Sequence, residues 1–157
     1  MYSSNLPIAI GTDGAGDGLK DIISNHLSSL GFKVDDFGVE SLYPNIALAV
    51  AQSIADGKHE RGILICGTGI GVCITANKVP GIRAAVCHDS YSAQRARKSN
   101  DCQIMTLGAR VVGEELAKNL VDIWLDSEFE PARSAEKVER ISEIEREIHP
   151  DCRPVSC

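Results

Sequence analysis

The sequence lacks the features that mark several large classes of protein. No run of apolar residues reaches the ~18 residues that a membrane-spanning helix requires. The six cysteines include no C-x-x-C pair, so the usual spacing of a zinc site is absent. The net charge of −6 argues against a nucleic-acid surface, which needs a basic stripe to neutralise phosphates. A few local cations, or a loop of backbone N–H groups, are still enough to hold one phosphate.

Signals for export are also missing. Residues 1–7 do not show the charged and then apolar order of a signal peptide, so we expect a cytoplasmic protein. A reducing compartment disfavours disulfides, and we expect Cys87 and Cys102 to be small buried residues at strands. Cys152 and Cys157 fall in the polar end of the chain, and we assign them no role.

No repeat or linker divides the chain, so we expect one domain over residues 1–157, with a polar tail at about residues 149–157. Short β-rich segments alternate with helical periods of apolar residues. The segments predicted as strands are residues 7–11, 33–37, 62–66, 83–87 and 103–107. The repeated β-α units predict an α/β fold, a single Rossmann-like, doubly wound sheet of five parallel strands with helices on both faces.

The last predicted helix has no strand after it to cover. Its apolar stripe consists of Val138, Ile141, Ile144 and Ile148, and its outer face is charged. We expect this stripe to pack either on the flank of the sheet or on a partner subunit.

Ligands of doubly wound sheets bind at the carboxyl ends of strands, near a topological switch point. That rule singles out residues 12–16 and 66–71, which follow the first and third predicted strands. The second segment reads Cys-Gly-Thr-Gly-Ile-Gly and lies between a strand and a helix. Its glycines allow successive N–H groups to point at one anion.

Three interpretations fit this glycine-rich segment. It can be a tight turn without a ligand, since such turns are common. It can be a dinucleotide site with Asp89 downstream, but Val72 stands where the fingerprint needs its third glycine, and the chain is short for two domains. It can be an anion cradle beside a reactive thiol, Cys66. A thiol at a helix N-terminus has a lowered pKa, whereas a core cysteine is inert, and position alone does not decide.

A longer stretch carries a family resemblance. Residues 65–83 read ICGTGIGVCITANKVPGIR, which resembles the signature of the type B ribose-5-phosphate isomerases. That family also contains the galactose-6-phosphate isomerase subunits and the tetrulose-phosphate isomerases. The similarity runs from Ile8 to about Glu145 and includes Asp13, Tyr43-Pro44, Ser99-Asn-Asp101 and Gly108-Ala-Arg-Val-Val-Gly113.

The resemblance implies an aldose–ketose isomerase that acts on a phosphorylated sugar through a cis-enediolate and uses no metal or cofactor. Its substrate would be ribose 5-phosphate and ribulose 5-phosphate, or a tetrulose 4-phosphate such as erythrulose 4-phosphate with erythrose 4-phosphate. The resemblance also implies a homodimer or a dimer of dimers. Both subunits would then build each active site, with the C-terminal helix reaching the partner.

The resemblance further implies which residue is the base. Family members place it either as a cysteine at the end of the third strand or as a glutamate just after the glycines. Val72 occupies the glutamate position and cannot take a proton, so Cys66 inherits the role. Thr68 resembles the hydroxyl that relays protons between the substrate oxygens. The N–H donors for the enediolate would come from the segment that contains Gly67, Gly69 and Gly71.

The remaining site residues are implied by the same resemblance. Asp13 and Asn100 resemble contacts to substrate hydroxyls, and Arg110 and Arg133 resemble the arginines that hold the phosphate. Lys137 stands where the family usually has another arginine, and it offers a point charge without the bidentate fork.

Two family histidines are missing. Gly14 and Ser99, both expected at the substrate, replace them, and the histidine usually found in place of Ser99 protonates the ring oxygen to open the sugar. Their loss favours a short, open-chain substrate over ribose 5-phosphate. His88 could approach the site from the end of the fourth strand, although a lone histidine there is more often structural.

A non-catalytic module that binds a sugar phosphate or a nucleotide is the alternative function. On that reading, loss of the histidines marks loss of activity. The retained Cys66 and Thr68 argue against it, because a binding module has no need for a thiol base.

Overall fold

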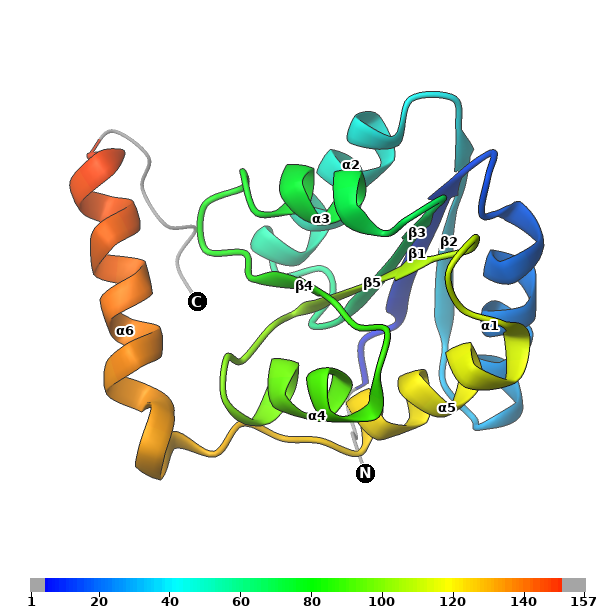
Figure 1. Cartoon of the computed structure of the whole chain (residues 1–157). Coiled ribbons are helices and arrows are strands. Elements are labelled where there is room, and N and C mark those ends of the chain that lie inside the picture. Colours follow the sequence, from blue (N-terminus) through cyan, green and yellow to red (C-terminus); the bar gives the residue numbers. More distant parts are fainter. Residues whose placement is uncertain (1–4, 151–157) are drawn as a thin grey trace.

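The centre of the computed structural model, which describes residues 5–150, is a sheet of five parallel strands (Figure 1). In spatial order the strands are β2 (Val34–Glu40), β1 (Ile8–Asp13), β3 (Gly62–Cys66), β5 (Ile104–Gly108) and β4 (Ala84–Val86). All five lie where the sequence predicts them, within a few residues at each end. The chain leaves β1 toward one side of the sheet and β3 toward the other, so the switch point lies between β1 and β3. Cys152 and Cys157 lie outside the described residues.

Helices cover both faces of the sheet (Figure 1). One face carries α1 (Asp17–Ser29), α4 (Ser90–Lys98) and α5 (Glu114–Leu125), and the other carries α2 (Tyr43–Ala55) and α3 (Ile70–Ala76). Successive side chains of β3 alternate between the two cores, as the pleat of a strand requires. Every residue of β3 and β5 is buried, which explains their continuous apolar runs. No helix within residues 5–150 is long and apolar enough to cross a membrane.

A buried arginine fixes the segment that leads from the sheet to the last helix. Arg61 directly precedes β3 and is 1% exposed. Its guanidinium donates to the main-chain oxygens of Trp124, Leu125 and Ser127 at 3.1, 3.2 and 3.2 Å, and to the Glu128 carboxylate at 2.9 Å. It also lies 5.3 Å from the centre of the Trp124 ring. Carbonyls at a helix end lack intrahelical partners, so Arg61 both caps α5 and anchors the segment after this helix.

The last helix, α6 (Pro131–Ile148), stands apart from the layers of the sheet (Figure 1). Its start is held by Glu130, whose N–H donates to the Lys98 carbonyl at 3.0 Å and whose carboxylate pairs with the Lys98 ammonium at 3.1 Å. Near its end the Glu145 carboxylate accepts the N–H of Gly81 at 2.8 Å. Three residues of the apolar stripe are exposed, namely Ile141, Ile144 and Ile148 at 48%, 39% and 64%. The stripe therefore does not pack on the flank of the sheet, which was one of its two expected positions.

We expect Arg61→Leu to lower the free energy of unfolding by about 3 kcal/mol, because three carbonyls and a carboxylate lose a buried donor. Urea unfolding followed by circular dichroism measures the change. Lys118→Met is the control, since it removes only exposed ion pairs to Glu114 and Glu115 on the same helix that Arg61 caps. Equal urea midpoints for Arg61→Leu and the wild type would contradict the anchoring role.

Candidate active site

A hollow of about 430 Å³ opens at the carboxyl edge of the sheet, over the ends of β1 and β3. This position is the topological switch point that the sequence singled out. The lining residues come from the ends of β1 and β3, the start of α2, the turn into α3, the first turns of α3 and the segment after β5. They are Asp13, Tyr43, Cys66, Gly67, Thr68, Ile70, Gly71, Ile74 and Arg110.

Cys66 ends β3 and is 4% exposed, with its sulfur beside the glycine loop, Gly67–Gly71. The N–H of Gly69 donates to Cys66 Sγ at 3.1 Å. Gly69 has a φ of 76°, and a Cβ there would lie 2.8 Å from the carbonyl carbon of Leu107. Only glycine satisfies both conditions, so the sequence Cys-Gly-Thr-Gly places an N–H donor on the thiol. That N–H joins the glycine loop to the sulfur by a hydrogen bond.

The glycine loop rests directly on the end of β5. A Cβ at Gly108 would lie 2.7 Å from the carbonyl of Thr68, so the two backbones touch. Three hydrogen bonds join the loop and β3 to this segment, from Ala109 N to Cys66 O (2.8 Å), from Arg110 N to Gly67 O (3.0 Å) and from Thr106 Oγ1 to Gly69 O (2.8 Å). The loop therefore has little freedom to move away from the thiol.

His88 supports the same unit from the end of β4. Its Nε2 accepts the N–H of Gly108 at 2.9 Å, so this nitrogen carries no proton. Burial lowers the pKa of His88, and the charge of Asp89 opposes that effect in part. His88 is not among the residues that line the hollow, and its contact agrees with the structural interpretation of the sequence.

Asp13 and Tyr43 flank the thiol on the other side. Asp13 Oδ1 accepts the N–H of Ala15 at 2.9 Å, which fixes the carboxylate at the end of β1. The ring of Tyr43 lies so close to the loop that a Cβ at Gly71 would stand 2.5 Å from it. Tyr43 was predicted only as part of the family resemblance, without a role, and the glycine at position 71 was the one local sign in the sequence that another group packs against the loop. Among the described residues, no atom other than those of its two chain neighbours lies within 4 Å of where a Cβ at Gly14 would stand, so the space beside this glycine is open.

Thr68 and Arg110 complete the hollow. Thr68 is exposed at the tip of the loop, and its Oγ1 accepts the N–H of Ile70 at 3.3 Å. The Arg110 guanidinium lies over Gly67, with Nη1 3.5 Å from where a Cβ of that glycine would stand. A thiol, a hydroxyl, a carboxylate, loop N–H donors and a cation thus share one hollow. This set can transfer a proton and stabilise the oxyanion that forms.

Four predicted site residues lie elsewhere. Ser99 and Asn100 follow α4, which runs back to the amino edge of the sheet, where the strands begin. There Arg83, just before β4, donates to the Asn100 carbonyl at 3.0 Å. Arg133 and Lys137 are exposed in the first turns of α6, whose start is tied to the end of α4. The length of β5 puts roughly 15 Å between the two edges, so these four cannot meet Cys66 within one chain.

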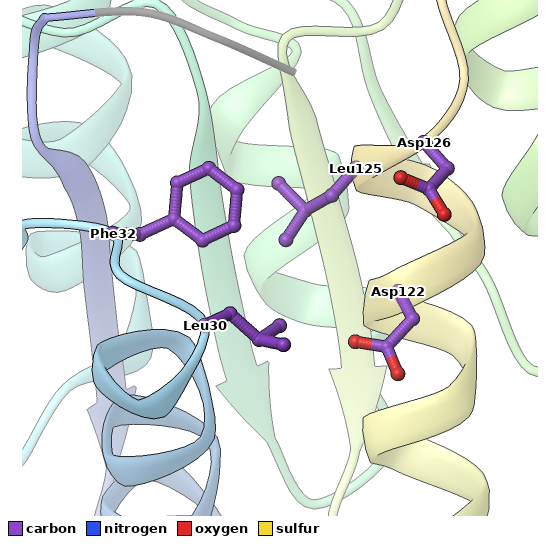
Figure 2. A pocket seen from close by; sticks show the side chains of 5 residues that line it. All are labelled: Leu30, Phe32, Asp122, Leu125 and Asp126. Carbon is purple, nitrogen blue, oxygen red and sulfur yellow. The ribbon is translucent and has the colours of Figure 1, made fainter. Parts of the chain in front are cut away.

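A second hollow, of about 180 Å³, lies between the ends of α1 and α5 (Figure 2). Leu30, Phe32 and Leu125 line it with apolar side chains, and the carboxylates of Asp122 on α5 and of Asp126 just after α5 also line it. Two negative charges in the lining repel an anion. A phosphorylated ligand therefore suits the hollow at Cys66 and not this one.

Comparisons with a family model and with characterised relatives all point to the same family. Residues 8–141 match the model of the ribose/galactose isomerase family. The chain is 56% identical over 147 residues to D-erythrulose-4-phosphate isomerase of Pectobacterium atrosepticum, covering 90% of this chain and 97% of the relative. It is 48% identical over 143 residues to ribose-5-phosphate isomerase B of Escherichia coli, covering 88% and 96%.

Solved structures agree with that result. The structure of Clostridium thermocellum ribose-5-phosphate isomerase B superposes with a TM-score of 0.88 at 48% identity, covering 91% of this chain and 99% of the other. The structure of Mycoplasma genitalium ribose-5-phosphate isomerase B with bound ribulose-5-phosphate gives a TM-score of 0.87 at 35% identity, covering 92% and 99%. Their close superposition supports the predicted α/β sheet and its topology.

His88 should make the fold less stable in acid. Its pKa in the fold is below the ordinary value of 6.5, so the unfolded chain binds more protons between these two values. The free energy of unfolding therefore falls as the pH drops through 6.5 toward the lowered pKa, and it is retained above 6.5. His88→Gln keeps an acceptor for Gly108 and cannot titrate.

Urea unfolding at several pH values between about 5 and 8 tests this expectation, because linkage appears as a pH-dependent difference between variants. The wild type should lose more stability toward acid than His88→Gln. The exposed His149→Gln should follow the wild type. Parallel curves for the wild type and His88→Gln would contradict the prediction.

Proposed function

Because this chain belongs to the ribose/galactose isomerase family and is a sugar-phosphate aldose–ketose isomerase, we propose that Cys66 is its catalytic base. The observation that carries the proposal is the thiol at the switch point, whose sulfur receives the Gly69 N–H at 3.1 Å. Val72 supports it, because this side chain of α3 is 0% exposed in the core that α2 and α3 share with the sheet, and it has no group that takes a proton.

The Cys66 thiolate takes the proton from C2 of the aldose, and the electrons of that bond form the C1–C2 double bond of an enediolate. The same thiol returns its proton to C1, while O2 loses its proton and becomes the ketone oxygen. Thr68 passes the hydroxyl proton from O2 to O1, so no net proton is consumed. The N–H groups of the glycine loop stabilise the enediolate charge, an effect worth ~3–4 kcal/mol for one such donor. Arg110, which lies over the loop, binds the phosphate.

Cys66→Ser should keep the fold and most substrate affinity yet lose several orders of magnitude in turnover, because a serine hydroxyl is a far weaker base at neutral pH. Steady-state kinetics and exchange of the substrate C–H proton with deuterium from solvent measure the loss. Cys73→Ser is the matched control, since burial raises the pKa of the Cys73 thiol and keeps it protonated. Near-normal turnover or exchange in Cys66→Ser would overturn the assignment.

We further propose that a second copy of the chain completes each site. Ser99, Asn100, Arg133 and Lys137 lie at the amino edge and serve the hollow of the partner, where Arg133 and Lys137 bind phosphate and Asn100 binds a hydroxyl. Two observations support this arrangement: the distance between the two edges within one chain, and the exposed stripe of α6, which needs a covering surface. The oligomer is a homodimer or a dimer of dimers.

Mixing two defective variants tests the shared site. Arg133→Ala should mainly raise KM, because phosphate is bound similarly in the ground and transition states. At low substrate concentration, Cys66→Ser and Arg133→Ala should each be poorly active, but their mixed dimer contains one intact site. Co-refolded mixtures should therefore recover activity toward a quarter of the wild type. No recovery, or a monomer by light scattering at micromolar concentration, would contradict the proposal.

We propose that the preferred substrate pair is D-erythrulose 4-phosphate and D-erythrose 4-phosphate, with ribose 5-phosphate as the slower alternative. An aldopentose phosphate rests mostly as a ring, and opening that ring calls for an acid at its ring oxygen. Ser99 is too weak an acid to supply this proton at neutral pH. A tetrose 4-phosphate has no free hydroxyl able to close a five-membered ring, so it needs no such acid. An activity panel of tetrose, pentose and hexose phosphates decides between them.

A reducing compartment suits the proposed base. Cys66, Cys73, Cys87 and Cys102 are all free thiols within residues 5–150. Cys66 acts as a base only while it stays reduced, and the cytoplasm is the compartment that keeps thiols in that state. We therefore place the enzyme there.

A further inference from the structure

Arg95 lies one helical turn before Ser99 and holds the hydroxyl of that serine. Its Nε donates to Ser99 Oγ at 2.7 Å, and its Nη2 donates to the same oxygen. Its Nη1 stands 3.9 Å from the Glu130 carboxylate, and its side chain is 31% exposed. The guanidinium is therefore fixed beside position 99, at the amino edge of the sheet and close to the start of α6.

The Arg95 guanidinium keeps N–H donors that Ser99 does not occupy. Two of its five N–H groups donate to Ser99, and the other three are one on Nη2 and two on Nη1, the nitrogen that stands 3.9 Å from the Glu130 carboxylate. Ser99 accepts from Arg95, which leaves its own hydroxyl proton to donate. A guanidinium stays charged at any physiological pH, so it cannot act as a general acid, but its planar fork fits a phosphate.

We propose that Arg95, held in place by Ser99, binds the phosphate of a four-carbon substrate in the partner's site and thereby selects that substrate. The inference rests on the shared site proposed above. In a ribose 5-phosphate ring, O4 is the ring oxygen that an acid at position 99 must protonate. In a tetrose 4-phosphate, the same O4 is the ester oxygen that carries the phosphate. The group needed at this place changes from an acid to a permanent cation, and Arg95 is such a cation.

Lys137 supports the same shift of the phosphate. A four-carbon substrate with C1 and C2 at Cys66 ends one carbon earlier than a five-carbon substrate, so its phosphate lies nearer to Arg95. The phosphate contact at position 137, which lies farther from Cys66, can then be weaker. Lys137 fits this, because its ammonium is a point charge without the bidentate geometry of a guanidinium.

The test compares kcat/KM for erythrulose 4-phosphate and ribulose 5-phosphate in the wild type and in Arg95→Leu. Loss of one charged hydrogen-bonding group should lower kcat/KM for the four-carbon substrate by about 10- to 100-fold, mainly through KM, and change the five-carbon value by less than about threefold. Lys98→Leu is the matched control, since it removes a neighbouring cation of α4 that pairs with Glu130. It should leave the ratio of the two values unchanged.

Two further variants keep the test decisive if Arg95→Leu fails to fold. Arg95→Lys keeps the charge without the fork, and Ser99→Ala removes the tether, so each should lower the four-carbon value selectively but by less. An equal effect on both substrates, or an unchanged ratio in these variants, overturns the inference and leaves the isomerase proposal intact. A wild type that turns over neither substrate overturns the proposed substrates as well.

Discussion

Gly108 and the backbone of Thr68 lie so close that a Cβ at position 108 would stand 2.7 Å from the Thr68 carbonyl, and a Cβ at Gly69 would crowd the Leu107 carbonyl at 2.8 Å. Two stretches of main chain are thus pressed together where β3 and β5 end. This contact directs the Gly69 N–H at the sulfur of Cys66 and keeps Arg110 over the loop. The sheet order makes the contact possible, because β5 and not β4 is the neighbour of β3.

The other parts of the molecule either support the contact between Gly108 and Thr68 or stabilise the amino edge of the sheet. Two apolar cores hold the strands in register, and the His88 ring secures Gly108 from the side. At the other edge, Arg61 anchors the end of α5, and Glu130 joins the start of α6 to α4. The polar groups expected at one substrate are therefore built on opposite ends of the same strands. A rigid sheet cannot bring its two ends together, and assembly of two copies is the physical solution that the proposed dimer supplies.

Much of the fold was predictable from the sequence, because its signals are local. The continuous apolar run of β3 and the glycine loop identified the switch point, and the burial of Cys87 and Cys102 is confirmed. The spatial order of β4 and β5 was not predictable, since alternating β-α units give no rule for which strand inserts between two others. Long-range pairings of single residues were equally hidden. The acceptor role of His88 and the capping of α5 by Arg61 depend on partners far away in sequence.

The candidate site was predicted in part for the same reason. Asp13 and the glycine loop follow the two strands that the carboxyl-edge rule singled out, and the structure places both at the hollow beside Cys66. Arg110, Ser99 and Arg133 came only from the family resemblance, which says nothing of the edge on which each lies. Arg95 and Ser99 are four residues apart, a spacing that allows contact along a helix. Because every helix contains such pairs, the contact could be linked to the site only after the structure located Ser99 at the amino edge of the sheet.

Gly14, which follows Asp13 at the exposed end of β1, is a position where a side chain can be exchanged without repacking the fold. Apart from its two chain neighbours, no described atom lies within 4 Å of where its side chain would begin. Exchange of the residue in either direction leaves both cores untouched and carries almost no stability cost. Variation at this point can therefore alter the size and polarity of the surface beside Asp13, while the strands beneath it keep their packing.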